Sequence, residues 1–217
     1  AASDRAGLAG GALRVEPDPD EPQNLLLIYP SATVADVYIP SQVKIESGAK
    51  SALDPNRALA IRPYLARDLD GLDLTVAGVT TVDPERTFWD KVLILHGLRA
   101  AFEAKNVLRG EGQRVSRHYY DLHRLLASEE GARAIADLDL AANCALHARL
   151  FFYRPDANLD AARPPTYALT PHDDMIPRLA QDYGLMQRMI FGAAPAFDAV
   201  LDSIARLETL VNQAPQA

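Results

Sequence analysis

Residues 81–96 read "TVDPERTFWDKVLILH", and the hydrophobic pattern of the chain changes within this stretch. Asp83 is a residue type that caps the first free amides of a helix, and Pro84 suits the first helical position. Apolar side chains then recur at helical spacing, namely Phe88, Val92, Leu95 and Phe102. The stretch predicts a helix from about residue 84 to 105, and the chain after it is mostly helical in pattern.

The chain before this stretch is strand-like. Between about residues 24 and 82, three apolar runs are separated by Pro, Gly, Asp and Asn: "NLLLIYP", "VYIPSQVKIES" and "LDLTVAGVTTV". In the second run Val43 and Ile45 alternate with Lys44 and Glu46, so one face of the strand is apolar and the other is charged. We expect the apolar face to be buried.

The chain after the stretch predicts four more helices, at about residues 116–127, 129–150, 171–191 and 195–213. Residues 153–174 hold too many prolines for a helix and predict a long loop. The fold class is therefore α+β. We expect a mixed sheet in residues 1–82 and an α-helical bundle domain in residues 83–217.

Composition restricts the class of protein. The 217 residues are 48% hydrophobic and 24% charged, as in an ordinary globular chain. A net charge of −7 argues against a surface that grips nucleic acid everywhere, although a local basic patch is compatible with it. The single cysteine, Cys144, cannot form an internal disulfide and is expected to be a small core residue. The sequence contains no membrane-length apolar run and no export signal, so we expect a cytoplasmic protein with no membrane partner.

Two charged residues on predicted helices are candidates for chemistry. Lys91 lies beside the apolar stripe of its helix, so its ammonium either runs along the core edge to a paired carboxylate or is a fixed cation aimed at phosphates. Asp121 lies in "SRHYYDLHRLL", residues 116–126, where Arg117 at i−4 can hold it in an ion pair. A carboxylate held in this way can also bind a metal or orient a cation.

Further charges surround these two. At the helical period Arg114, Arg117, Asp121 and Arg124 fall on one face, which is either a solvated ion-pair face or part of a site. Glu46 is either an edge-strand charge that discourages aggregation or a catalytic carboxylate held on a rigid strand. The histidines and Cys144 lack the spacing of a zinc site, and the glycine-rich stretches lack that of a P-loop.

Together these motifs resemble a known family. "YPSATVADVYIPSQVKIESGAKS", "IRPYLA", "TVDPERTFWDKVLILH", "SRHYYDLHRLL", "DYGLMQRMIFG" and "FDAVLDSIARLE" are similar in order and spacing to the AbiEii/AbiGii-type nucleotidyltransferase toxins. The resemblance implies a DNA-polymerase-β-like nucleotidyltransferase core followed by a helical domain. It also implies a toxin that acts with a separate antitoxin and, with Mg²⁺, transfers a nucleotide from an NTP to an acceptor such as tRNA.

The resemblance also implies residue roles. Lys91 and Asp121 correspond to the motif lysine and aspartate of the family, and Glu46 to a strand carboxylate that is catalytic and binds metal. Arg117 corresponds to the family's arginine before the aspartate. With Arg114, Arg124 and Lys44, it is expected to bind nucleotide or acceptor.

The sequence departs from the family in one respect. The family carries a Gly-Gly-Ser/Thr turn followed by a strand with an Asp-x-Asp pair, and this chain shows no such turn and strand. Two-metal phosphoryl transfer depends on that pair, so we expect the chain to cover about the C-terminal two-thirds of the family pattern and to lack much of the metal site. The alternative function is an inactive remnant that binds RNA or the antitoxin. The sequence does not specify the nucleotide, the acceptor or the oligomeric state.

Overall fold

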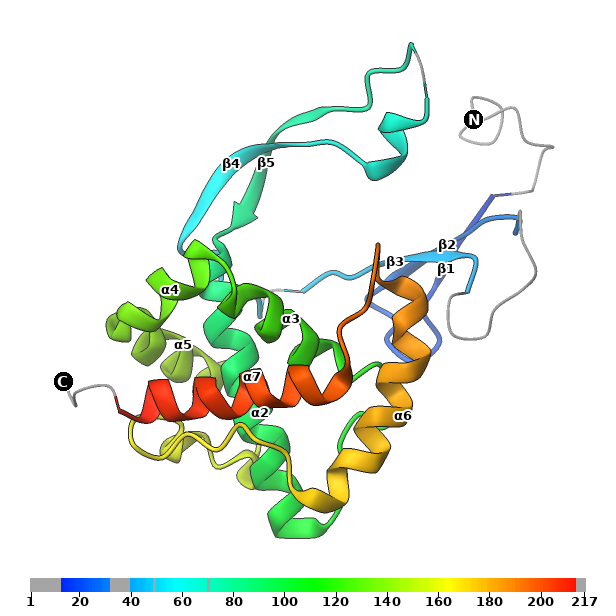
Figure 1. Cartoon of the computed structure of the whole chain (residues 1–217). Helices are drawn as coiled ribbons and strands as arrows, with labels where there is room; N and C mark the ends of the chain where they lie inside the picture. The colour runs from blue at the N-terminus through cyan, green and yellow to red at the C-terminus, as the bar shows by residue number, and fades with distance from the viewer. Residues whose placement is uncertain (1–12, 32–39, 49, 70, 214–217) are drawn as a thin grey trace. The chain divides into compact units, whose positions relative to one another are not determined.

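The structure is a computed structural model that describes residues 13–31, 40–48, 50–69 and 71–213 (Figure 1). The chain forms two compact units, Ala1–Ser51 and Ala52–Ala217. The strand-to-helix change falls at residues 82–84, where the sequence divides 1–82 from 83–217. Compactness, by contrast, groups the strands after Ser51 with the helices.

The first unit contains a three-stranded antiparallel sheet in the order β1-β2-β3. Its strands are β1 (Arg14–Pro17), β2 (Leu25–Ile28) and β3 (Gln42–Ile45). The prediction that the apolar face of β3 is buried was wrong, because Val43 and Ile45 are 51% and 48% exposed. Strands of four residues form too small a layer to bury either face without a second layer packed on them.

The second unit begins with a hairpin of β4 (Asn56–Ile61) and β5 (Val76–Val82), which carries a 3₁₀ turn, η1 (Tyr64–Arg67). The sequence predicted β2, β3 and β5 but neither β1 nor β4. It also predicted a mixed sheet, whereas every strand pair within the described ranges is antiparallel. The paired strands are consecutive in the chain, and consecutive strands can pair antiparallel without the crossover helix that a parallel pair usually needs.

Helix α2 (Pro84–Lys105) has the predicted bounds and forms the centre of the second unit. Phe88, Trp89, Val92 and Leu95 are fully buried. The Trp89 indole donates to the carbonyl of Ala134 at 2.9 Å. The expected capping by Asp83 was wrong: Asp83 holds the N-cap position, but its side chain makes no capping bond and lies 3.0 Å from Nε of Arg57 in β4. The nearby guanidinium attracts the carboxylate away from the helix amides.

Three helices pack on or near α2: α3 (Arg117–Leu126), α4 (Glu129–Ala136) and α5 (Leu138–Phe151) (Figure 1). The sequence predicted one helix over residues 129–150, but the structure breaks it at Asp137. The backbone of Asp137 is not helical, and its side chain accepts a hydrogen bond from the amide of Leu140 at 2.9 Å. An aspartate that caps the next helix competes with continuation of the one before it.

The proline-rich segment after α5 is irregular, as predicted, apart from short 3₁₀ turns η2 (Pro155–Ala157), η3 (Leu159–Ala161) and η4 (Asp173–Met175). It is fixed to the core by His96, whose ring nitrogens contact the Asn158 carbonyl at 3.0 Å and the Ala168 amide at 3.1 Å. The remaining helices are α6 (Ile176–Met186), the 3₁₀ turn η5 (Gln187–Met189) and α7 (Phe197–Asn212).

The α+β class is confirmed: small antiparallel sheets precede a helical bundle in which α7 packs on α3 (Figure 1). Cys144 is a buried core residue, as expected, and burial raises the pKa of its thiol to about 12. None of the helices in the described ranges has both the length and the apolar character needed to cross a membrane.

Candidate functional site

An ion pair joins the two central motifs of the sequence. Nζ of Lys91 on α2 lies 2.6 Å from Oδ2 of Asp121 on α3, and the two side chains are 18% and 36% exposed. The sequence offered Arg117 as the partner of Asp121, but in the described structure the ion pair is with Lys91. The packing of α3 on α2 decides this, because it brings Lys91 against the Asp121 face and leaves Arg117 exposed.

The position of α3 depends on both apolar and polar contacts. Tyr119 and Leu122 are fully buried and fix the inner face of the helix. At its start, Oδ2 of Asp182 on α6 accepts hydrogen bonds from the Ser116 amide at 2.8 Å and the Ser116 hydroxyl at 2.6 Å. Ser116 is fully buried and Asp182 is 5% exposed. Asp182 therefore holds the beginning of the helix that carries Asp121.

Sequence reasoning missed this contact. Asp182 opens "DYGLMQRMIFG", a motif that carried the family resemblance without any assigned role. An aspartate placed on the apolar face of a predicted amphipathic helix is a usable signal, because a buried carboxylate needs hydrogen-bond donors. The sequence does not reveal which donors supply them.

The arginines expected on one face divide into two groups. Arg117 and Arg124 lie on α3 and are exposed. Arg114 precedes the helix and has φ 60°, in the left-handed region, so the prediction that it continues the helical face was wrong. The Arg117 amide donates to the Arg114 carbonyl, three residues earlier. This hydrogen bond closes a turn at the start of α3, so Arg114 is not in the interior of the helix.

His118 lies next to the ion pair and is held neutral. Burial, reinforced by the positive charges of Lys91 and Arg117, lowers the pKa of His118 to about 3. Its Nδ1 is buried with no hydrogen-bond partner among the described residues. An imidazolium at this position would add a third cation to a desolvated site, which explains the direction of the shift.

Glu46 and Lys44 belong to the other compact unit. Glu46 follows β3 directly, and its side chain is 74% exposed. Nζ of Lys44 lies 2.6 Å from Glu21 and 2.9 Å from Asp18. The hydrogen bonds that Lys44 donates to Glu21 and, next in effect, to Asp18 raise the pKa of Lys44. Lys44 is therefore engaged within its own sheet.

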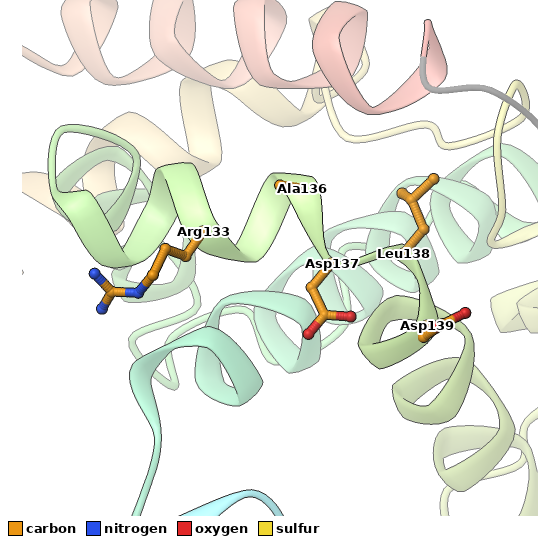
Figure 2. Close-up of a pocket in the computed structure, with 5 residues that line it drawn as sticks. All are labelled: Arg133, Ala136, Asp137, Leu138 and Asp139. Carbon is orange, nitrogen blue, oxygen red and sulfur yellow. The ribbon is translucent and has the colours of Figure 1, made fainter.

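The described residues contain no group of three or more metal-ligating side chains. Two hollows in the described part of the chain are lined by neither Lys91 nor Asp121. One of about 420 Å³ is at the junction of α4 and α5 (Figure 2), lined by Arg133, Ala136, Asp137, Leu138 and Asp139. Its Arg133 is paired with Glu85 and its Asp137 caps α5, so these two charges serve the fold. Another, of about 730 Å³, lies between α5 and the proline-rich segment.

A sequence profile described as "Nucleotidyl transferase AbiEii toxin, Type IV TA system" matches residues 4–203. The chain belongs to the AbiEii nucleotidyltransferase toxin family. No curated protein and no solved structure gives a significant match. The AbiEii match includes both helices of the Lys91–Asp121 pair, and the family assignment implies a toxin with an antitoxin as its partner. The roles of individual side chains stay predictions.

Proposed function

We propose that this AbiEii-family protein acts in the cytoplasm as a toxin that transfers a nucleotide from an NTP to an RNA acceptor such as tRNA. One observation carries the proposal. Lys91 and Asp121 come from separate sequence motifs that resemble the family's, and they meet at 2.6 Å on adjacent helices. Exposed Arg117 lies on the same helix as Asp121, so the pair lies beside a cation that is open to an anionic substrate.

The proposed roles follow from the chemistry of the groups. A lysine ammonium has three donors and no acceptor, so Lys91 can keep its bond to Asp121 while it donates to a triphosphate oxygen. Asp121 then acts as an orienting group that prevents the flexible lysine from turning to solvent. Arg117 and Arg124 attract the phosphates of nucleotide or acceptor, and a preorganised cation of this kind stabilises charge in the transition state.

Mg²⁺ belongs to the proposal as the metal that the family's reaction uses, but the described residues do not fit a complete site. They supply no cluster of three ligands, Asp121 is bound by Lys91, and Glu46 is in the separate first unit. We therefore assign no chemical step to the metal in this chain. Glu46 stays a candidate ligand.

Nucleotide transfer tests the proposal. The chain, and in parallel the complete product of its gene, is incubated with each labelled NTP, Mg²⁺ and total tRNA. We expect labelled RNA, and a loss of labelling with Lys91→Ala or Asp121→Asn. Lys105→Ala is the matched control, because Lys105 is on the same helix and also pairs with an aspartate, Asp156, at 2.9 Å. Full labelling by folded Lys91→Ala protein would contradict the assignment.

The second candidate function is a binding module that recognises tRNA or the antitoxin without catalysis. The lack of a three-ligand group among the described residues favours it, because phosphoryl transfer in this superfamily depends on metal. Absence of labelling by every form of the protein, with retained binding to tRNA or antitoxin, would support the module and exclude the transferase.

A further inference from the structure

The C-terminal end of α5 exposes an unusual concentration of aromatic side chains. Phe151, Phe152 and Tyr153 are consecutive and are 47%, 51% and 64% exposed. His147, one turn earlier, stacks on Phe151 with ring centroids 4.8 Å apart and an interplanar angle of 29°. Its ring is also 5.8 Å from that of Phe152. We call His147, Phe151, Phe152 and Tyr153 the aromatic strip.

The strip lies at the end of a helix that packs on α2. Helix α5 runs beside α2 in the same direction, since Arg86 near the start of α2 bonds Asn143 at 3.1 Å and Gly97 further along lies against Arg154 and Ala157. Asp90 and Ile94 on α2 are therefore close to the level of the strip, and their side chains are 45% and 38% exposed.

The same part of α2 carries the proposed site. Burial raises the pKa of Asp90, and the charges of Arg86, His147 and Lys91 oppose that rise, in this order. Asp90 is thus within electrostatic range of both a member of the strip and the lysine of the ion pair. Helix α2 is in contact with α5, which carries His147 of the strip, and with α3, which carries Asp121.

The segment that carries the strip is basic, unlike the chain as a whole. Residues 141–154, "AANCALHARLFFYR", contain two arginines and no carboxylate, whereas the whole chain has a net charge of −7. Arg149 has a loose ion pair with Asp160 at 3.5 Å. Arg154 is exposed and has no carboxylate within ion-pair distance in the described part of the chain. Flat rings beside Arg154, which lacks a carboxylate partner among the described residues, match a ligand that is both planar and anionic.

We propose that the aromatic strip, with Arg149 and Arg154, binds unpaired bases of the RNA acceptor by stacking. This inference rests on the proposed function, because RNA is the acceptor there. Base stacking on an aromatic ring is tolerant of sequence, and arginines beside the rings contact the phosphates. A second copy of the chain fits the strip less well, since a two-fold contact would bring the same arginines against each other.

Binding is measured by fluorescence anisotropy of fluorescein-labelled oligoadenylate RNA, without NTP or Mg²⁺, so that nucleotide transfer is not required. We expect the Phe152→Ala/Tyr153→Ala variant to bind at least about tenfold more weakly, equivalent to about 1.4 kcal/mol. This value is within the range for loss of a stacked base, about 1–3 kcal/mol. RNA in a duplex with oligouridylate should bind weakly, because its bases are not available.

Two matched variants separate stacking from unfolding and from general loss of apolar surface. Phe152→Tyr/Tyr153→Phe keeps both rings and should bind like the wild type. Phe191→Ala removes a ring that is 83% exposed but lies against Tyr64 near the hairpin, and it should also leave RNA binding unchanged. Far-UV circular dichroism and emission of buried Trp89 check that each variant is folded.

Two results would overturn the inference: unchanged affinity in the double alanine variant, or an equal loss with Phe191→Ala. The transfer assay keeps this test separate from that of the proposed function. If no form transfers nucleotide but the double variant loses RNA binding, the transferase function is rejected and the RNA-binding role of the strip is retained. If transfer occurs and the double variant has an unchanged KM for RNA, the RNA-binding role of the strip is rejected and the transferase function is retained.

Discussion

The Lys91–Asp121 pair predicts a small effect on stability together with a large effect on activity. Exposed ion pairs contribute about 0.2–1 kcal/mol, whereas removing one partner of a fully buried pair costs about 3–5 kcal/mol. The side chains of this pair are 18% and 36% exposed, and their charged atoms are 2.6 Å apart. We therefore expect a coupling free energy near the upper limit for exposed pairs, about 1 kcal/mol.

A double-mutant cycle measures this coupling. Lys91→Ala, Asp121→Ala and the double variant are unfolded in urea and followed by the emission of Trp89, which is the single tryptophan and is fully buried in the same helix as Lys91. With a slope of about 2 kcal/mol per molar urea, the coupling corresponds to a midpoint difference of about 0.5 M. High salt should reduce it, because solvent ions screen the exposed side of the pair.

Activity should respond far more strongly. Removing one preorganised electrostatic group from an active site costs about 10²–10³ in rate, so each single variant should lose nucleotide transfer while it keeps most of its stability. A coupling above about 3 kcal/mol would refute this reasoning, since the pair would then be a buried structural element. Near-normal transfer by either single variant would refute it as well.

Three further predictions concern buried groups. Asp182→Ala should destabilise the protein by about 2–4 kcal/mol in urea unfolding, because it leaves the amide and hydroxyl of buried Ser116 without an acceptor. Asp182→Asn keeps an acceptor oxygen and should destabilise the protein less. Equal destabilisation by the two variants would contradict the hydrogen-bond explanation. The pKa of His118 is about 3 in the folded chain, whereas its ordinary value is 6.5. The contribution of neutral His118 to the free energy of unfolding is therefore complete above pH 6.5 and is lost as the pH falls towards 3. His118→Leu should flatten the curve of stability against pH between pH 7 and 5, and an unchanged curve would show that His118 is not buried in its neutral form. Cys144, with a thiol pKa of about 12, should react slowly with a thiol reagent at pH 8 and rapidly in denaturant; rapid reaction of the folded protein would mean that the thiol is accessible.

The sequence by itself determined the helices with strong local signals. The bounds of α2 follow from the proline at its start and from the apolar period after it, and both act over a few residues. The α+β class and the burial of Cys144 also follow from local pattern. The family resemblance rests on motifs in the printed sequence and was confirmed by the match over residues 4–203.

Other features depended on competition between local and distant partners. Asp83 has the chemistry of a helix cap, but Arg57 from the hairpin takes its carboxylate. Asp121 has Arg117 one turn away, but Lys91 on another helix pairs with it. In each case two interactions of similar strength were available to the carboxylate, so local spacing alone did not select between them.

Only the tertiary structure brought Lys91 and Asp121 into contact, placed Asp182 at the start of α3, and left the rings of Phe151, Phe152 and Tyr153 exposed at the end of α5. A periodic sequence specifies which face of a helix is apolar, because that follows from 3.6 residues per turn. It does not specify which neighbour covers that face, because this depends on packing among segments that are distant in the chain. The tertiary structure therefore decides which partners contact the side chains at the edge of such a face, where a site forms.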